Sequence, residues 1–347
     1  MTAATRRTRP VATRPVAARP VAARAPFRAC LVALVAAVLG SGCVGLRPSP
    51  IPLEQRPADR VTVPTSALHY RGYADAAALA RALRYTDGAE RLVSVHRGAP
   101  VEGLAENAVP TFEHALNYAP ALVELDVRRT PDGHLVLMHD ASLDRTTTGA
   151  GRVDATPFAA VRAVRLLDVR GALTSFRVPT LAEALAWAEG RAVIMLDSKG
   201  DVPYPEIVAA VRAARAENRV VVIVYSLAAH EAVTALAPDL NVSSSLDTPA
   251  EADALLAAGR EGRVDLSRTI AFAGVGRADP EVVARMHAAG VRVQVGTFPL
   301  DAAADAATDP AVYTPFLEAG IDVLATDNVR SASEAVRAFN TARLRRR

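Results

Sequence analysis

The sequence predicts an α/β fold of the (β/α)8 TIM-barrel type, with a small insertion in the loop after the second strand. From residue 91 onward, short apolar runs rich in β-branched residues alternate eight times with alanine-rich stretches of helical spacing. The region 91–347 also has the usual length of this fold, roughly 250 residues. The main alternative, a doubly wound open sheet, is disfavoured because no GxGxxG loop follows the first apolar run.

The eight expected strands are short and apolar on both faces, as buried parallel strands are. They cover residues 92–96, 122–127, 192–196, 220–225, 241–246, 269–272, 291–295 and 323–326. A further apolar run at 134–140 follows the second strand directly. We expect it to form a short strand or arm in an enlarged loop that returns near Pro179.

Helix start signals stand between the expected strands. Thr180 and Glu183 have capping-box spacing before residues 184–188. Pro249 and Pro280 stand in the first turn of two further helices, where proline is tolerated. An alanine- and leucine-rich segment, 74–84, precedes the first strand, and we expect a short helix packed under the barrel.

Residues 1–43 have the pattern of a bacterial export signal. An arginine- and proline-rich arm leads into the apolar run 29–39 and then Gly-Ser-Gly before Cys43. The run is shorter than the ~20 residues that a membrane-spanning helix needs. A lipoprotein-type signal with lipidation at Cys43 is predicted, with ordinary cleavage nearby or an uncleaved anchor as alternatives. The protein is therefore expected to be exported, periplasmic or at the cell surface, and membrane-anchored.

The remaining chain is divided into two parts. Residues 44–90 are interpreted as a proline-rich tether with the short helix, and residues 91–347 as the barrel domain. Both cysteines, Cys30 and Cys43, lie in the leader. The barrel then has no disulfide, no thiol nucleophile and no cysteine metal site.

The net charge of +3 comes from the leader. Residues 1–53 hold eight arginines and no acid, so the other 32 basic and 37 acidic residues give a net charge of −5. Without a basic body the protein is not expected to bind nucleic acid. The sequence leaves the oligomeric state open.

Polar and ionisable residues stand where several expected strands end. The active site of a TIM barrel lies at the carboxyl ends of its strands, so these residues are site candidates. They are, in strand order, His96 and Arg97, Glu124 and Asp126, Asp197 and Lys199, Ser226, and Asp327.

Carboxylates dominate two of these strand ends. Glu124 and Asp126 share a strand face, and adjacent carboxylates repel unless a cation or a shared proton lies between them. With Asp197 they form an oxygen-only set, which suits one hard divalent cation, Mg²⁺ or Ca²⁺, better than zinc. A solvated strand end is the alternative, and the apolar flanking residues disfavour it.

Two histidines and two cations complete the candidate site. Arg97 offers a planar cation for a phosphate or carboxylate, and Lys199, the only lysine in the chain, a compact point charge. His96 and His139 suit general acid–base catalysis of in-line displacement at phosphorus. The alternatives are a capping or packing role for His96 and chance for Lys199. The other five histidines are interpreted as surface residues.

The string HRG…EN…ELDV…TPDGHLVLMHD…LDRTT resembles the bacterial branch of the glycerophosphodiester phosphodiesterase family. The resemblance extends through VPTLAEAL and the LDSK segment to AGIDVLATD near the end. It implies a TIM barrel, a divalent metal, and hydrolysis of a phosphodiester to an alcohol and a phosphomonoester such as sn-glycerol 3-phosphate. It also implies roles, with His96 and His139 as the catalytic pair, Glu124, Asp126 and Asp197 as metal ligands, and Arg97 and Lys199 as phosphate contacts.

The chain departs from the family pattern at two positions. Asp197 stands where the third ligand is usually glutamate. Gly296 stands where a tryptophan commonly ends the seventh strand, so either the pocket is wider or Phe298 replaces that ring. Ser226 and Phe298 are therefore expected as possible substrate-lining residues.

Three functions remain compatible with these residues. The first is hydrolysis of glycerophosphodiesters with two histidines as acid and base. The second is phospholipase D- or C-like cleavage of lysophospholipids or other lipid headgroups. The third is a non-catalytic surface lipoprotein that binds a polyol phosphate.

Overall fold

The computed structural model describes residues 68–346, except residue 201 and residues 305–308. The predicted export signal, Cys43 and the tether up to residue 67 lie outside the described residues.

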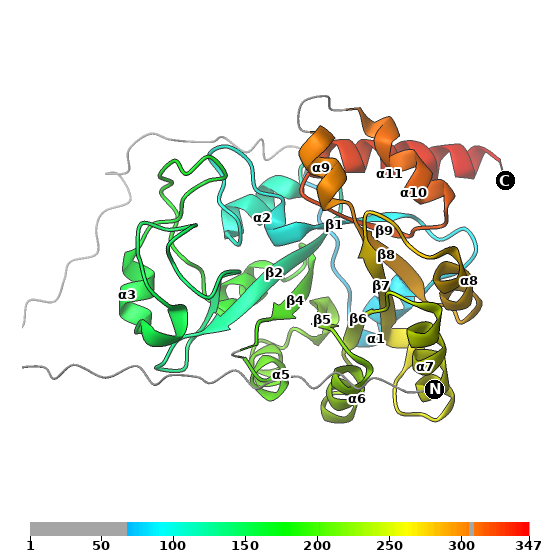
Figure 1. Ribbon diagram of the computed structural model, residues 1–347, viewed down its shortest axis with the longest axis horizontal. Coiled ribbons are helices and arrows are strands. Elements are labelled where there is room, and N and C mark those ends of the chain that lie inside the picture. The colour runs from blue at the N-terminus through cyan, green and yellow to red at the C-terminus, as the bar shows by residue number, and fades with distance from the viewer. Residues whose placement is uncertain (1–67, 201, 305–308, 347) are drawn as a thin grey trace, which may run out of the picture. The chain divides into compact units, whose positions relative to one another are not determined.

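Eight parallel strands form a closed barrel (Figure 1), because β1 pairs with β2 on one side and with β9 on the other. The predicted fold class is confirmed, and each predicted strand is present to within two or three residues at its ends. In the order of their pairing, the strands are β1 (Leu92–Val95), β2 (Leu122–Arg129), β4 (Val193–Ser198), β5 (Val220–Val224), β6 (Asn241–Ser245), β7 (Thr269–Val275), β8 (Arg292–Gly296) and β9 (Val323–Thr326).

Helices follow the strands and bury their apolar faces against the outside of the barrel. They are α2 (Val109–Ala115), α4 (Leu181–Trp187), α5 (Tyr204–Ala213), α6 (Leu227–Leu236), α7 (Pro249–Arg260), α8 (Pro280–Ala288), α9 (Phe298–Ala304), α10 (Thr314–Glu318) and α11 (Val329–Arg345). The predicted capping box starts α4, where Thr180 Oγ1 accepts from Glu183 N at 3.1 Å and Glu183 Oε2 accepts from Thr180 N at 2.7 Å.

Helix α1 (Ala76–Leu83) closes the amino-terminal end of the barrel. The carboxylate of Asp75 caps it by accepting from Ala78 N at 2.7 Å. Leu79 and Leu83 are buried among residues at the strand starts, including Leu92. The helix predicted at 74–84 is thus present and packs against the barrel as expected.

The predicted insertion after β2 is also present. Strand β3 (Leu135–Leu137) pairs antiparallel with β2, and the 3-10 turn η3 (Val153–Ala155) and α3 (Phe158–Ala163) follow it. This segment lies beside the barrel at the left of Figure 1 and has a small apolar core of its own. That core includes Ala105 and Ala108 from the loop after β1, so the two loops pack together.

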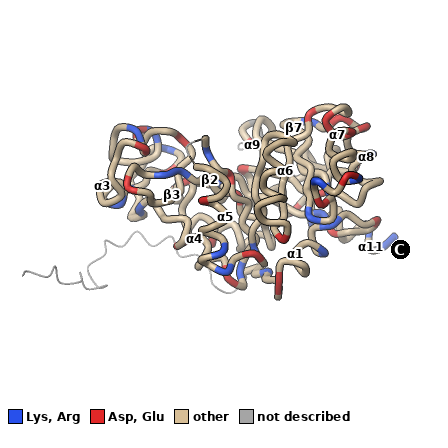
Figure 2. Tube along the Cα trace, turned by 90° about the horizontal axis from the view of Figure 1, so that it is seen from below, with Lys and Arg blue, Asp and Glu red and all other residues tan. Residues whose placement is uncertain are grey.

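Basic and acidic residues are interspersed along the described chain, as the blue and red segments of the tube in Figure 2 show. Within the described residues, none of the helices combines the length and the apolar character needed to cross a bilayer.

Candidate active site

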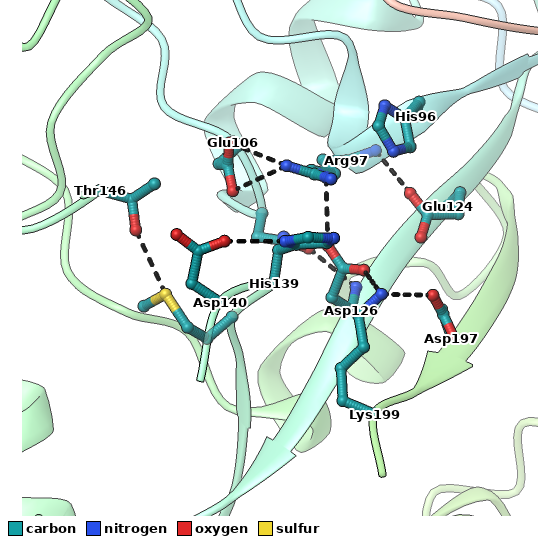
Figure 3. Close-up of polar contacts among 12 residues, drawn as sticks. His96, Arg97, Glu106, Glu124, Asp126, His139, Asp140, Thr146, Asp197 and Lys199 are labelled. Carbon is teal, nitrogen blue, oxygen red and sulfur yellow. Dashed lines mark hydrogen bonds and ion pairs between the residues drawn. The ribbon is translucent and has the colours of Figure 1, made fainter. Parts of the chain in front are cut away.

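Three buried carboxylates meet inside the barrel (Figure 3). Glu124 and Asp126 share a face of β2, and the register of β2 with β4 places Asp197 opposite Asp126. The three side chains are at most 8% exposed, and one oxygen of each lies within 4.8 Å of the others. The predicted trio is therefore brought together by strand alternation and strand register.

The electrostatic environment shifts the pKa values of Glu124 and Asp126 in opposite directions. Burial and the neighbouring charge of Asp126 hold the pKa of Glu124 well above its usual value. Burial would also raise the pKa of Asp126, but Lys199 and the amide of Asn107 outweigh it and lower that pKa. A cluster of this charge is stabilised by a cation between the oxygens.

Lys199 supplies part of that positive charge. Its Nζ lies 2.7 Å from Asp126 Oδ1 and 2.5 Å from Asp197 Oδ2. Burial disfavours the ammonium, yet the two carboxylates raise the pKa of Lys199 above its usual value. Tyr225 donates to the same Asp197 oxygen at 2.7 Å, so that oxygen has two donors.

The carboxylate trio fits a hard divalent cation. Asp197 Oδ1 is buried and has no hydrogen-bond partner among the described residues. A buried carboxylate oxygen without a donor is costly unless a cation or water satisfies it. The oxygen-only donor set suits Mg²⁺ or Ca²⁺, which would be held by Glu124, Asp126 and Asp197.

The turn after β1 is strained in a way that serves the site. Arg97, Ala99 and Asn107 adopt positive φ values of 52°, 55° and 56°, a region that costs non-glycine residues roughly 1–2 kcal/mol each. The turn directs Arg97 N to Glu124 Oε2 at 2.7 Å. Asn107 in turn holds Asp126, donating to its Oδ2 at 2.7 Å and accepting from its backbone N at 2.9 Å.

His96 stands at the carboxyl end of β1 and is oriented from the end of β9. Its Nδ1 donates to Asp327 Oδ1 at 2.9 Å. Asp327 is itself positioned by Asp301 on α9, whose Oδ2 accepts from Asp327 N at 2.8 Å. Burial raises the pKa of Asp301, whose other oxygen accepts from Tyr313 and Thr326.

His139 is oriented in the same way by its neighbour. Its Nδ1 donates to Asp140 Oδ1 at 2.8 Å, and Arg145 donates to both oxygens of Asp140, at 2.6 and 3.0 Å. Arg145 also binds both oxygens of Glu106, at 2.9 and 2.8 Å. Because Glu106 lies 3.4 Å from Arg97 Nη1, the network connects His139 to the turn after β1.

Both histidines line one cavity of about 190 Å³ at the carboxyl ends of the strands. The cavity holds the carboxylate trio, Lys199 and the ring of Phe298. A Cβ added at Gly296 would lie 2.7 Å from that ring, and the ring centroid is 4.3 Å from that of His96. Phe298 therefore occupies the space that the missing side chain at Gly296 would take.

Two expectations from the sequence need correction. Ser226 is not among the residues lining the cavity, because its hydroxyl caps α6 by accepting from Ala229 N at 3.2 Å. Tyr225, one residue earlier, lines the cavity instead. His230 is buried at 1% exposure on α6, so its interpretation as a surface residue is wrong.

Several further contributors to the site escaped the sequence analysis, among them Tyr225, Asn107, Arg145, Glu106 and Asp301. Asn107 and Arg145 fall inside quoted motif segments, EN and LDRTT, so the motif carried a signal for them. Glu106 also lies in the EN segment, whereas Asp301 lies in no motif and is close to the site only through tertiary packing.

The family model for the glycerophosphoryl diester phosphodiesterase family matches residues 96–331. A glycerophosphodiester phosphodiesterase from Caldanaerobacter subterraneus subsp. tengcongensis is 31% identical over 162 residues. The match covers 44% of this chain and 65% of that relative, which is less than two thirds of its length.

Two solved structures share the architecture. A glycerophosphoryl diester phosphodiesterase from Parabacteroides distasonis is 29% identical with a TM-score of 0.70, covering 78% of this chain and 94% of that one. A phosphodiesterase from Oleispira antarctica, solved in complex with the product sn-glycerol-3-phosphate, is 19% identical with a TM-score of 0.55. That match covers 72% of this chain and 97% of the other, and it shows the shared fold.

The family model spans more than half of the chain, and the residues that it covers include the carboxylate trio and both cavity histidines. The chain belongs to the glycerophosphoryl diester phosphodiesterase family.

Proposed function

We propose that the protein hydrolyses glycerophosphodiesters to an alcohol and sn-glycerol 3-phosphate in a metal-dependent reaction. The observation that carries this proposal is the shared cavity, which combines two carboxylate-oriented histidines with three buried carboxylates and Lys199. The Oleispira antarctica protein binds the same product, which makes it the first compound to test here.

The chain's residues would divide the reaction as follows. Arg97 and Lys199 supply fixed positive charge for the non-bridging phosphate oxygens. Hydrogen bonds at Nδ1 leave the Nε2 atoms of His96 and His139 for proton transfer. One histidine takes a proton from the attacking water as the new P–O bond forms, and the other protonates the leaving alcohol oxygen as its P–O bond breaks. A bound divalent cation would add charge stabilisation beside the phosphate.

The test is turnover of glycerophosphocholine by the purified protein with added Mg²⁺ or Ca²⁺. We expect ³¹P NMR to show sn-glycerol 3-phosphate, and chelation with EDTA to stop its formation. Absence of turnover on any phosphodiester with either metal contradicts the enzyme proposal. Binding of sn-glycerol 3-phosphate without turnover would instead identify a polyol-phosphate-binding protein.

A second candidate substrate class is the lysophospholipids. A hollow of about 470 Å³ shares His96 with the catalytic cavity and is lined by Val101 and Val169, which are 37% and 57% exposed. An apolar tail could lie along such side chains. Turnover of glycerophosphocholine is compared with turnover of lysophosphatidylcholine by ³¹P NMR. The comparison distinguishes the two substrate classes, because their phosphate-containing products carry different groups on the phosphate.

We also propose export with a lipid anchor at Cys43, on the basis of the leader sequence. Metabolic labelling with a fatty acid should label the wild-type protein in a bacterial host and not the Cys43→Ser variant. Equal labelling of the two proteins would contradict anchoring at this residue.

A further inference from the structure

The interior of this barrel is polar at a place where TIM barrels usually pack branched apolar side chains. Strand β6 directs Ser243 and Ser245 into the catalytic cavity, and β8 directs Gln294 into it. Ser243 and Gln294 are buried at 2% and 4% exposure, so these polar groups belong to the cavity wall.

The amide of Gln294 is incompletely satisfied. Its Oε1 is buried and has no hydrogen-bond partner within the described part of the chain. A buried acceptor left unpaired is costly, so such groups are usually paired with a ligand or ordered water. Gln294 therefore offers an acceptor to whatever fills the cavity.

Its position along β8 indicates which part of a substrate it meets. Gln294 precedes Gly296, the last residue of β8, by two residues, or about 6.6 Å of strand. The ring of Phe298 lies over Gly296. Gln294 thus belongs to the deeper wall of the cavity, on the side of Phe298 that faces into the barrel.

We propose that Gln294 determines specificity by accepting a hydrogen bond from the terminal hydroxyl of the substrate's glycerol group. This inference rests on the proposed function, because it takes the glycerol phosphate to be bound among the carboxylates and histidines. The terminal hydroxyl is the glycerol oxygen farthest from phosphorus, and it would extend to the deeper wall. A methyl group in place of this hydroxyl would leave the acceptor unpaired. A site built to hydrogen-bond a hydroxyl discriminates strongly against a ligand that lacks it.

The test compares two ligands and two protein variants. The ligands are sn-glycerol 3-phosphate and its analogue 2-hydroxypropyl phosphate of matching configuration, in which a methyl group replaces the terminal CH₂OH. Dissociation constants are measured by calorimetry in the presence of Mg²⁺ or Ca²⁺ for the wild type and for Gln294→Leu. In parallel, kcat/KM is measured with the two corresponding phosphocholine diesters, one carrying the glycerol group and one the 2-hydroxypropyl group. Both diesters keep the hydroxyl on the carbon next to the phosphoester carbon.

We expect the wild type to prefer the glycerol ligand roughly 10- to 100-fold and Gln294→Leu to lose most of this preference. The dissociation constant of the methyl analogue should differ by less than about 3-fold between the wild type and Gln294→Leu. An undiminished preference in Gln294→Leu, or an equal loss for both ligands, overturns the inference. The binding measurement does not require turnover. An inactive wild type would therefore count against the proposed function only. The dissociation constants decide the role of Gln294 in either case.

The chain offers a matched control in Asn241. Its amide is also buried and without partners among the described residues, and strand alternation places it on the face of β6 that carries Ser243. Asn241 does not line the cavity. We expect Asn241→Leu to keep the wild-type preference. Loss of the preference in this variant would assign the effect to general barrel polarity and overturn the specific role of Gln294.

Discussion

His96 and His139 follow different strands, β1 and β3, yet each turns the same ring nitrogen, Nδ1, toward a carboxylate. Such a bond fixes the ring orientation and favours the tautomer with its proton on Nδ1. The opposite nitrogen, Nε2, is then the atom that can exchange a proton with a substrate. Asp140 is well suited to this role because the hydrogen bonds from Arg145 hold its pKa well below the usual value and keep it ionised.

Removing one of these rings should abolish acid–base catalysis and leave the fold intact. We expect His139→Ala to lower kcat/KM for glycerophosphocholine about 10²- to 10⁴-fold. The side chain is 35% exposed, so thermal unfolding should change little. Retention of the full rate would show that His139 is not the proton-transfer group.

Arg145 should act on the reaction only through Asp140 and Glu106. We expect Arg145→Met to lower kcat roughly 10-fold, because Asp140 and its histidine lose their fixed orientation. Arg212→Met is the matched control, since Arg212 also bridges two carboxylates, Asp239 and Glu217, outside the site. Equal effects of the two variants on kcat would contradict a positioning role for Arg145.

At the scale of elements, α1 contributes stability at the end of the barrel opposite to the catalytic cavity. Leu79 is fully buried against the strand starts. We expect Leu79→Ala to lower the free energy of unfolding by about 2–5 kcal/mol, measured by urea denaturation. The kcat of the folded protein should stay within 2-fold of wild type.

The control for this change is Leu344→Ala on α11, where the leucine is 73% exposed. We expect it to change the free energy of unfolding by less than about 0.5 kcal/mol. If Leu79→Ala were as mild as Leu344→Ala, α1 would not be part of the barrel's cooperative core.

At the scale of the whole molecule, buried His230 links stability to pH. Burial lowers the pKa of His230 to about 4, below the value near 6.5 expected in the unfolded chain. Between these values the unfolded state binds more protons, so stability falls as the pH falls from 6.5 to 4. The shift corresponds to a loss on the order of 3 kcal/mol.

We expect His230→Leu to remove this part of the pH dependence. Its free energy of unfolding, measured by urea denaturation at pH 7, 6, 5 and 4.5, should fall less than that of the wild type. Parallel pH profiles for the two proteins would show that His230 is not the responsible group.

A divalent cation should also stabilise the whole fold, because the carboxylate trio comes together only in the folded state. Binding adds about 2.7 kcal/mol when the free metal is 100 times its Kd. We expect Mg²⁺ or Ca²⁺ to raise Tm, EDTA to reverse the rise, and Asp197→Asn to reduce it strongly. Asp239→Asn, on the exposed pair with Arg212, should respond to metal like the wild type. An unchanged response in Asp197→Asn would remove that residue from the ligand set.

Features that depend on residues close in sequence could be predicted from the chain alone. The alternating strands, the capping box at Thr180 and the placement of Glu124 and Asp126 on one face are local consequences of side-chain type and spacing. Asp197 could be added because parallel strand ends meet at one rim. For these reasons the barrel and the carboxylate trio could be predicted from the sequence.

Contacts between distant residues were decided only by the tertiary structure. His96 and Asp327 are 231 positions apart, and their pairing requires the closure of β1 against β9. The hydroxyl of Ser226 caps α6 instead of lining the cavity. The ring of Phe298 fills the space beside Gly296, so replacement of the missing ring by Phe298, and not a wider pocket, is the outcome found. The unpaired oxygen of Gln294 is visible only after every neighbouring donor has been placed. Spacing determines which faces side chains share, whereas packing determines which partners they find.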